Sequence, residues 1–130
     1  MTAATNPDDR RAAEQRGRRA ETVAALYLRF LGWSILGRRF TSGRGSGAGE
    51  VDLIARRGDV VAFIEVKARP TVEEALESLT TAQRARIARG AEAWLQMNPR
   101  HAERSLRFDV VAVPGTGRPH HLPDAWRPEA

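Results

Sequence analysis

The chain has 130 residues, which suits one domain and leaves no room for two. It contains no cysteine, and this excludes a disulfide scaffold, a thiolate nucleophile and a zinc–thiolate site. No apolar run approaches the roughly 18 residues of a membrane span, and acidic residues interrupt any signal-peptide core near the N-terminus. We therefore expect a cytoplasmic protein with no membrane partner.

The charge of the chain favours a polyanionic partner such as nucleic acid, because the net charge is +5 and the pI is about 11.1. Of the 21 cationic residues, 20 are arginine and only Lys67 is lysine. This skew indicates a composition that replaces lysine with arginine wherever either residue serves. A single lysine could occur at any position by chance, so whether Lys67 indicates a function depends on the residues around it.

Six regular elements are predicted from hydrophobic periodicity and from turn residues. Acidic residues at positions 8 and 9 suit the start of a helix, and Gly32 suits its end. Gly58-Asp59 separates two apolar runs and is typical of a hairpin turn. In chain order, we expect a helix from residue 8 or 9 to 31, strands at 33–40, 50–57 and 60–67, a helix at 81–97 and a strand at 106–113.

The remaining segments are expected to be irregular. They are a disordered N-terminus at 1–8, a glycine-rich loop at 41–49, an acidic segment at 71–79, and a Pro- and Gly-rich tail at 114–130 that packs on or near the domain. The domain itself is expected at 9–113. The order of helix, three strands, helix and strand indicates an α/β fold in which helices flank a mixed sheet of four to five strands.

Charged residues interrupt both strands of the predicted hairpin. Glu65 and Lys67 lie two positions apart, so their side chains project from one face, roughly 7 Å apart along the strand. Glu50 and Asp52 repeat the pattern on the other strand, and the turn allows Asp52 to meet Glu65. Two carboxylates with open coordination positions suit Mg²⁺, and their repulsion should raise the pKa of at least one of them. A lysine beside them can orient or deprotonate a water and offset the charge of a phosphate.

The same residues also fit an ordinary hairpin that carries charges on its solvent face. In that case Glu65 and Lys67 form a weak surface ion pair. The position of the only lysine inside this triplet favours the catalytic interpretation, and the other stays open on the residues alone.

Asp52, twelve intervening residues and Glu65-x-Lys67, behind a helix that bears Glu21, resemble the PD-(D/E)xK nuclease site. More closely, the chain resembles the YraN family (uncharacterised protein family 0102) of small bacterial proteins with a restriction-endonuclease-like fold. The resemblance spans about residues 17–126. It is carried by Gly17-x-x-x-Glu21-x-x-Ala24-x-x-Tyr27-Leu28, Gly49-Glu-Val-Asp-Leu-Ile-Ala55, Phe63-Ile-Glu-Val-Lys67, Arg107-Phe-Asp-Val-Val111 and His121-Leu-Pro-Asp-Ala-Trp126.

The resemblance implies a restriction-endonuclease-like fold and a nuclease site in which Asp52 and Glu65 hold the metal and Lys67 positions the water. It adds Glu21 as a third carboxylate, with Mg²⁺ as the cofactor and Mn²⁺ as its substitute. Val51 replaces the proline of the superfamily name, at a position that is structural. Gln83 stands where the family usually has a lysine. An amide can hydrogen-bond a phosphate but brings no charge, so the role of this position is open.

Other polar residues are assigned less specific roles. Glu50 is either a base beside the metal ligands or a structural ion-pair partner. Asp109 is expected to be a capping or pairing residue. His120 and His121 could bind a metal, but they are expected on a solvated tail because no cluster of cysteines or carboxylates lies near them in the sequence.

The expected function is Mg²⁺-dependent hydrolysis of phosphodiester bonds in DNA, with structured or branched DNA among the candidate substrates. Arginines at the start of the first helix are candidates for phosphate contacts. One such domain has one active site, so cutting two strands would require a homodimer. The alternative function is a non-catalytic nucleic-acid-binding protein that retains the nuclease fold.

Overall fold

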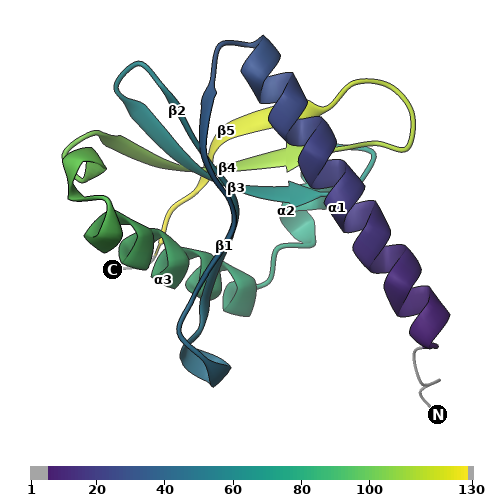
Figure 1. Cartoon of the computed structure of the whole chain (residues 1–130). Coiled ribbons are helices and arrows are strands. Elements are labelled where there is room, and N and C mark those ends of the chain that lie inside the picture. Colours follow the sequence, from purple (N-terminus) through teal and green to yellow (C-terminus); the bar gives the residue numbers. More distant parts are fainter. Residues whose placement is uncertain (1–5, 129–130) are drawn as a thin grey trace.

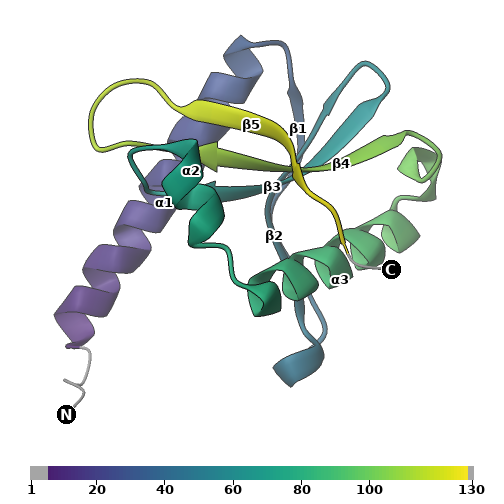
Figure 2. The ribbon, with the colours of Figure 1, turned by 180° about the vertical axis from the view of Figure 1, so that it is seen from behind.

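A five-stranded sheet lies between helices in the computed structural model, which describes residues 6–128 (Figures 1 and 2). The strands lie in the order β1-β2-β3-β4-β5, and every neighbouring pair is antiparallel except the parallel pair β3–β4. The elements are α1 (Pro7–Phe30), β1 (Ser34–Ser42), β2 (Gly49–Arg57), β3 (Val60–Lys67), α2 (Val72–Glu77), α3 (Thr81–Met97), β4 (Ser105–Ala112) and β5 (His120–Trp126), with short 3-10 turns at Gly45–Gly47 and Pro99–His101.

The two faces of the sheet carry separate apolar cores. Helix α1 covers one face with a stripe of small residues, and α2 and α3 cover the other, as the two opposite views show (Figures 1 and 2). Because side chains alternate along a strand, β3 sends Ile64 toward α1 and Phe63 toward α3. Glu65 and Lys67 continue the Phe63 series, which places them on the face that α3 covers. The mixed α/β fold class and the element order expected from the sequence are confirmed.

Strands β2 and β3 form the expected hairpin around Gly58, whose φ of +60° suits a residue without a side chain. Their pairing runs from Arg57 opposite Val60 to Leu53 opposite Ile64 and then stops. The earlier part of β2 pairs only with β1, through positions such as Val51 opposite Phe40. The two strands therefore part at Asp52 and Glu65, which would be the next pair in the register.

Helix α3 packs against β2 at unusually short range. A Cβ on Gly90 would lie 2.8 Å from the backbone nitrogen of Glu50, and a Cβ on Gly49 would lie 2.5 Å from the backbone nitrogen of Gly90. This approach requires glycine at both positions, because a side chain at either one would clash with the backbone of the other element. The contact fixes the start of β2, and with it Glu50 and Asp52, relative to α3.

The ends of the regular elements differ from the sequence expectation in several places. Helix α1 begins at Pro7, where Asn6 accepts a hydrogen bond from the backbone of Asp8, so residues 6–8 are ordered. The rest of the expected disordered segment, residues 1–5, lies outside the described residues. The segment 71–79 is not irregular, because Thr71 caps the short helix α2 through the backbone of Glu74. Helix α3 has the predicted bounds.

The segment after residue 113 adds a strand to the sheet instead of only a tail. Strand β5 pairs with β4, and Trp126 is buried opposite Phe108. The expectation of a solvated His121 was therefore wrong, because its Nε2 lies 2.8 Å from a carboxylate oxygen of Asp109. The sheet extends beyond the end expected for the domain.

Asp109 is fully buried and acts as the pairing residue that the sequence indicated. Arg107 donates two hydrogen bonds to its carboxylate, at 3.0 and 2.8 Å, and the backbone N–H of Asp124 donates a third at 2.9 Å. Burial alone would raise the pKa of Asp109, but the hydrogen bonds from His121, Arg107 and Asp124 lower it overall. This group ties β5 to β4.

None of the helices within residues 6–128 has the length and apolar character that crossing a membrane would require.

Candidate functional site

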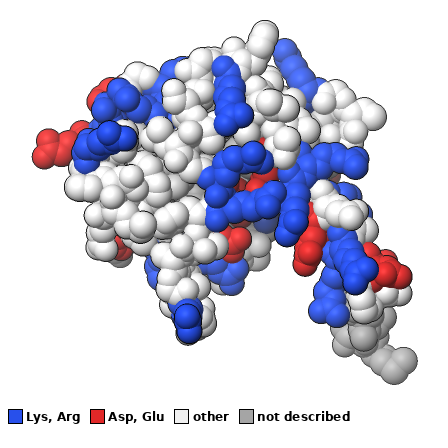
Figure 3. All heavy atoms as spheres, viewed as in Figure 1, with Lys and Arg blue, Asp and Glu red and all other residues white. Residues whose placement is uncertain are grey.

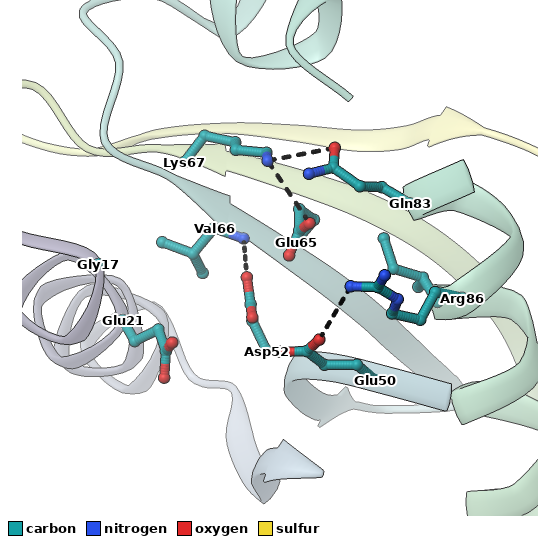
Figure 4. A pocket seen from close by; sticks show the side chains of 10 residues that line it. Gly17, Glu21, Glu50, Asp52, Glu65, Val66, Lys67, Gln83 and Arg86 are labelled. Carbon is teal, nitrogen blue, oxygen red and sulfur yellow. Dashed lines mark hydrogen bonds and ion pairs between the residues drawn. The ribbon is translucent and has the colours of Figure 1, made fainter. Parts of the chain in front are cut away.

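A polar hollow of about 230 Å³ lies where β2 and β3 part, between α1 on one side and α3 on the other (Figure 4). It is smaller than the pockets that usually enclose organic ligands, and six of its ten lining residues have ionisable side chains. Its wall contains every site residue expected from the sequence. They are Glu21 from α1, Glu50 and Asp52 from β2, Glu65 and Lys67 from β3, and Gln83 from α3.

Asp52 and Glu65 are in contact at the centre of this hollow. Oδ2 of Asp52 accepts a hydrogen bond from the backbone N–H of Val66 at 2.9 Å, so a side chain serves this amide where the β2–β3 ladder has ended. The carboxyl of Glu65 is hydrogen-bonded to that of Asp52. Burial, followed by this hydrogen bond and the charge of Asp52, raises the pKa of Glu65 to about 9. The expectation that one carboxyl would have a raised pKa is confirmed.

Lys67 lies beside this pair and is held from two sides. Its Nζ lies 3.8 Å from Oε2 of Glu65 and donates a hydrogen bond of 3.4 Å to Oε1 of Gln83 (Figure 4). The side chains of Lys67 and Glu65 are only 16% and 13% exposed. A weak surface ion pair on a solvated hairpin face would be far more exposed, so that interpretation is wrong for these two residues.

Gln83 has a structural role that fixes its position. It is the third residue of α3, and its Oε1 accepts a hydrogen bond from the backbone N–H of Thr80 at 3.0 Å. The hydroxyl of Thr80 in turn accepts one from the backbone N–H of Gln83 at 3.1 Å, which completes a capping box. One amide oxygen thus joins the start of α3 to the ammonium group of Lys67.

Glu21 reaches into the hollow from the opposite side, from α1 (Figure 4). Its Oε1 accepts a 2.6 Å hydrogen bond from Nε of Arg39, which lies on β1. Burial raises the pKa of Glu21, the hydrogen bond from Arg39 lowers it, and the nearby charge of Asp52 raises it, with a net rise.

Glu50 lies at the outer edge of the hollow. Its Oε2 is 3.6 Å from a guanidinium nitrogen of Arg86 on α3, and both side chains are half exposed. Of the two roles that the sequence left open, this contact matches that of an ion-pair partner.

The contacts fit a divalent cation in part. Asp52 and Glu65 present oxygen ligands at the same point, and the raised pKa of Glu65 reflects a pair of carboxyls that a bound cation would stabilise in the charged form. The expected third ligand does not join them. Within residues 6–128, no three side chains of the types His, Cys, Asp and Glu are grouped closely enough to hold a metal ion.

The contacts of two arginines at the site were not predicted from the sequence. Arg39 and Arg86 bind Glu21 and Glu50 across 18 and 36 residues of chain, and no local pattern marks such contacts. The capping role of Gln83 did have a signal, because Thr80-Thr81-Ala82-Gln83 follows the S/T-x-x-E/Q pattern of a helix start.

The chain is similar to a described family over most of its length. Residues 20–113 match the model of the uncharacterised protein family UPF0102. A UPF0102 protein of Paramagnetospirillum magneticum, amb4503, is 57% identical over 116 residues, which is 89% of this chain and 90% of that protein.

Two other relatives have comparable coverage. A UPF0102 protein of Methylocella silvestris is 49% identical over 88% of this chain and 90% of its own length. One of Rhodopseudomonas palustris is 48% identical over 91% of this chain and 89% of its own length. The matched region contains Asp52, Glu65 and Lys67. The chain therefore belongs to UPF0102, which is the YraN family.

Proposed function

We propose that the chain is a Mg²⁺-dependent endonuclease that hydrolyses phosphodiester bonds in DNA. The observation that carries this proposal is the contact of the Asp52 and Glu65 carboxyls beside a half-buried lysine, at the point where two strands part. Two acidic oxygen donors and one cation in a small polar hollow suit a metal ion and a phosphate group. They do not suit an enclosed organic ligand.

Each residue has a role that its contacts support. Asp52 and Glu65 hold Mg²⁺, which supplies Lewis-acid activation of the phosphate and of a water when it is bound. Lys67 is kept near this point by Gln83 and Glu65, so its ammonium group can position the attacking water and offset the charge that develops on the phosphate. Attack of the water on phosphorus forms one P–O bond and breaks the bond to the leaving sugar oxygen, which takes up a proton.

The arrangement of arginines supports a nucleic-acid substrate. The N-terminal part of α1 extends past the sheet on the side to which the β1–β2 hairpin also projects (Figures 1 and 2). It carries five exposed arginines, and positive side chains also gather between β1 and α1 on the face shown in Figure 3. Such a surface attracts phosphates without reading sequence. The five arginines of α1 are Arg10, Arg11, Arg16, Arg18 and Arg19.

The test is a cleavage panel of supercoiled, linear, nicked and branched DNA and of RNA, each with Mg²⁺, with Mn²⁺ and with EDTA. We expect metal-dependent cleavage by the parent protein and none by Asp52→Asn. Asp59→Asn is the matched control, because Asp59 is exposed in the turn at the far end of the same hairpin. Equal cleavage by the parent and Asp52→Asn would refute the assigned site.

Binding without cleavage is the second candidate function, and one observation favours it. Glu21 is paired with Arg39 and does not join the other two carboxyls. If the parent protein binds DNA in a salt-dependent way but cleaves nothing in the panel, the binding function is the better account.

A further inference from the structure

The ion pair of Arg39 and Glu21 joins a half-buried acid to an exposed cation. The Nε–Oε1 distance is 2.6 Å, and the Glu21 and Arg39 side chains are 13% and 45% exposed. A short bond between two charged groups is stronger than an ordinary hydrogen bond, particularly where the acid is shielded from water. Glu21 is thus held on one side of the hollow by a residue that solvent can still reach.

Arg39 makes this contact from an unusual backbone conformation. Its φ is +49°, in the left-handed region that residues other than glycine and asparagine rarely adopt. It lies in β1 between Arg38, which pairs with Leu53, and Phe40, which pairs with Val51, so it stands across from Asp52. Strained residues of this kind are concentrated at functional sites.

The bond to Glu21 leaves much of the Arg39 guanidinium available to a ligand. It uses Nε, whereas a guanidinium carries five N–H donors in a planar fork that matches phosphate. A phosphate that hydrogen-bonds to these N–H groups of Arg39 would weaken the ion pair between Arg39 and Glu21. Glu21 lines the same hollow as Asp52 and Glu65, so the proposed third ligand already belongs to the wall of the same site.

We propose that Arg39 is a positioning residue that couples substrate binding to metal binding. It holds Glu21 away from Asp52 and Glu65, and a phosphate of the nucleic acid releases Glu21 by pairing with Arg39. Glu21 then becomes the third oxygen ligand of the cation. This inference rests on the proposed function, because it assumes that Asp52 and Glu65 bind a divalent cation.

The first test measures the affinity for Mn²⁺ alone by calorimetry in the parent, Arg39→Asn and Arg38→Asn proteins. Asparagine tolerates a positive φ, so the substitution at position 39 should not harm folding, and thermal melts check this. Arg38 is the matched control, because it lies next in the strand and near Glu21 but bonds Thr22 instead. We expect Arg39→Asn to bind Mn²⁺ about tenfold more tightly than Arg38→Asn, the effect of removing one charged hydrogen bond.

Glu21→Gln shows whether the effect acts through Glu21. In that background, Arg39→Asn and Arg38→Asn should bind Mn²⁺ equally. Equal or weaker binding by Arg39→Asn in the Glu21 protein would overturn this inference and leave the proposed metal site intact. Absence of Mn²⁺ binding in all the proteins at millimolar concentrations would refute both.

The second test adds a short DNA duplex, in the Lys67→Arg background so that cleavage during the titration is slow. The duplex should raise the Mn²⁺ affinity several-fold when Arg39 is present, and Mn²⁺ should raise the duplex affinity by the same factor. With Arg39→Asn this coupling should fall to near unity, whereas Arg38→Asn should retain it. An unchanged coupling in Arg39→Asn would overturn the role of the phosphate.

Discussion

Replacing Glu65 with glutamine should make the protein more stable at neutral pH, although it removes a proposed metal ligand. The Glu65 carboxyl has a pKa of about 9 in the folded protein and an ordinary value of 4.5, because it is buried against Asp52. It therefore stays protonated in the folded chain at pH 7, whereas the unfolded chain releases this proton. Glutamine keeps the shape of the side chain and offers Asp52 an N–H donor in place of the O–H of a protonated carboxyl, and it has no titratable proton.

The size of the effect follows from linkage. Since the folded pKa is raised, the folded chain binds more protons than the unfolded chain between pH 4.5 and 9, and the free energy of unfolding falls as pH rises through that range. At pH 7 the penalty on the parent protein is roughly 3 kcal/mol, from about 1.4 kcal/mol for each pH unit above the unfolded pKa. Glu65→Gln does not carry this penalty.

Urea unfolding of both proteins at pH 5, 7 and 8.5 in EDTA measures the difference directly. The stability gained by Glu65→Gln should be small at pH 5 and should grow with pH, while Mg²⁺ should stabilise only the parent protein. Glu92→Gln is the control, because Glu92 is exposed on α3 and should not change the pH profile. A gain that does not depend on pH would refute the contact between the two carboxyls.

Three other substitutions, one of them with a matched control, test separate contacts. Lys67→Arg should lower Mg²⁺-dependent nicking by about 100-fold, since a bulky guanidinium displaces the reacting groups, while DNA binding should be unchanged. Nicking at the parental rate would exclude a catalytic role for Lys67. Gly90→Ala should lower the free energy of unfolding by about 1–3 kcal/mol, because its Cβ would meet the backbone of β2. Its control, Gly17→Ala, lies where α1 has open space and should raise the free energy of unfolding by up to about 1 kcal/mol. Urea unfolding measures both, and a Gly90→Ala protein as stable as Gly17→Ala would contradict the close packing of α3 on β2. Asp109→Asn should cost roughly 3 kcal/mol in the same measurement, because Arg107 loses its buried counter-ion, and a neutral result would show that the group does not stabilise the sheet.

The carboxylate pair could be predicted because its geometry is local. A two-residue turn at Gly58-Asp59 sets the register of the hairpin, and counting back from it places Asp52 opposite Glu65. The position of Lys67 on the same face as Glu65 could be predicted from the two-residue period of a strand. These inferences needed no knowledge of the rest of the fold.

The parts that the sequence did not predict depend on distant contacts or on weak local signals. Strand β5 carries Pro123 and lacks a clear alternation of apolar and polar residues, so its sequence does not indicate a strand. It forms because it pairs with the edge of β4 and because Asp109 binds two of its residues. Helix α2 has only six residues, too few for a helical period to emerge. The bond from Arg39 to Glu21 requires both the packing of β1 against α1 and a left-handed backbone that arginine does not favour.

The buried carboxylate of Asp109 also sets an order on biosynthesis. Of its partners, only Arg107 precedes it, and His121 and Asp124 lie near the C-terminal end of the chain. A nascent chain that has emerged only as far as β4 would bury this charge with a single counter-ion, so we expect β4 to be less stably held in the sheet until β5 has been synthesised. We therefore expect the hairpin that carries Asp52 and Glu65 to reach its final place only after β5, at the far edge of the sheet, has joined β4.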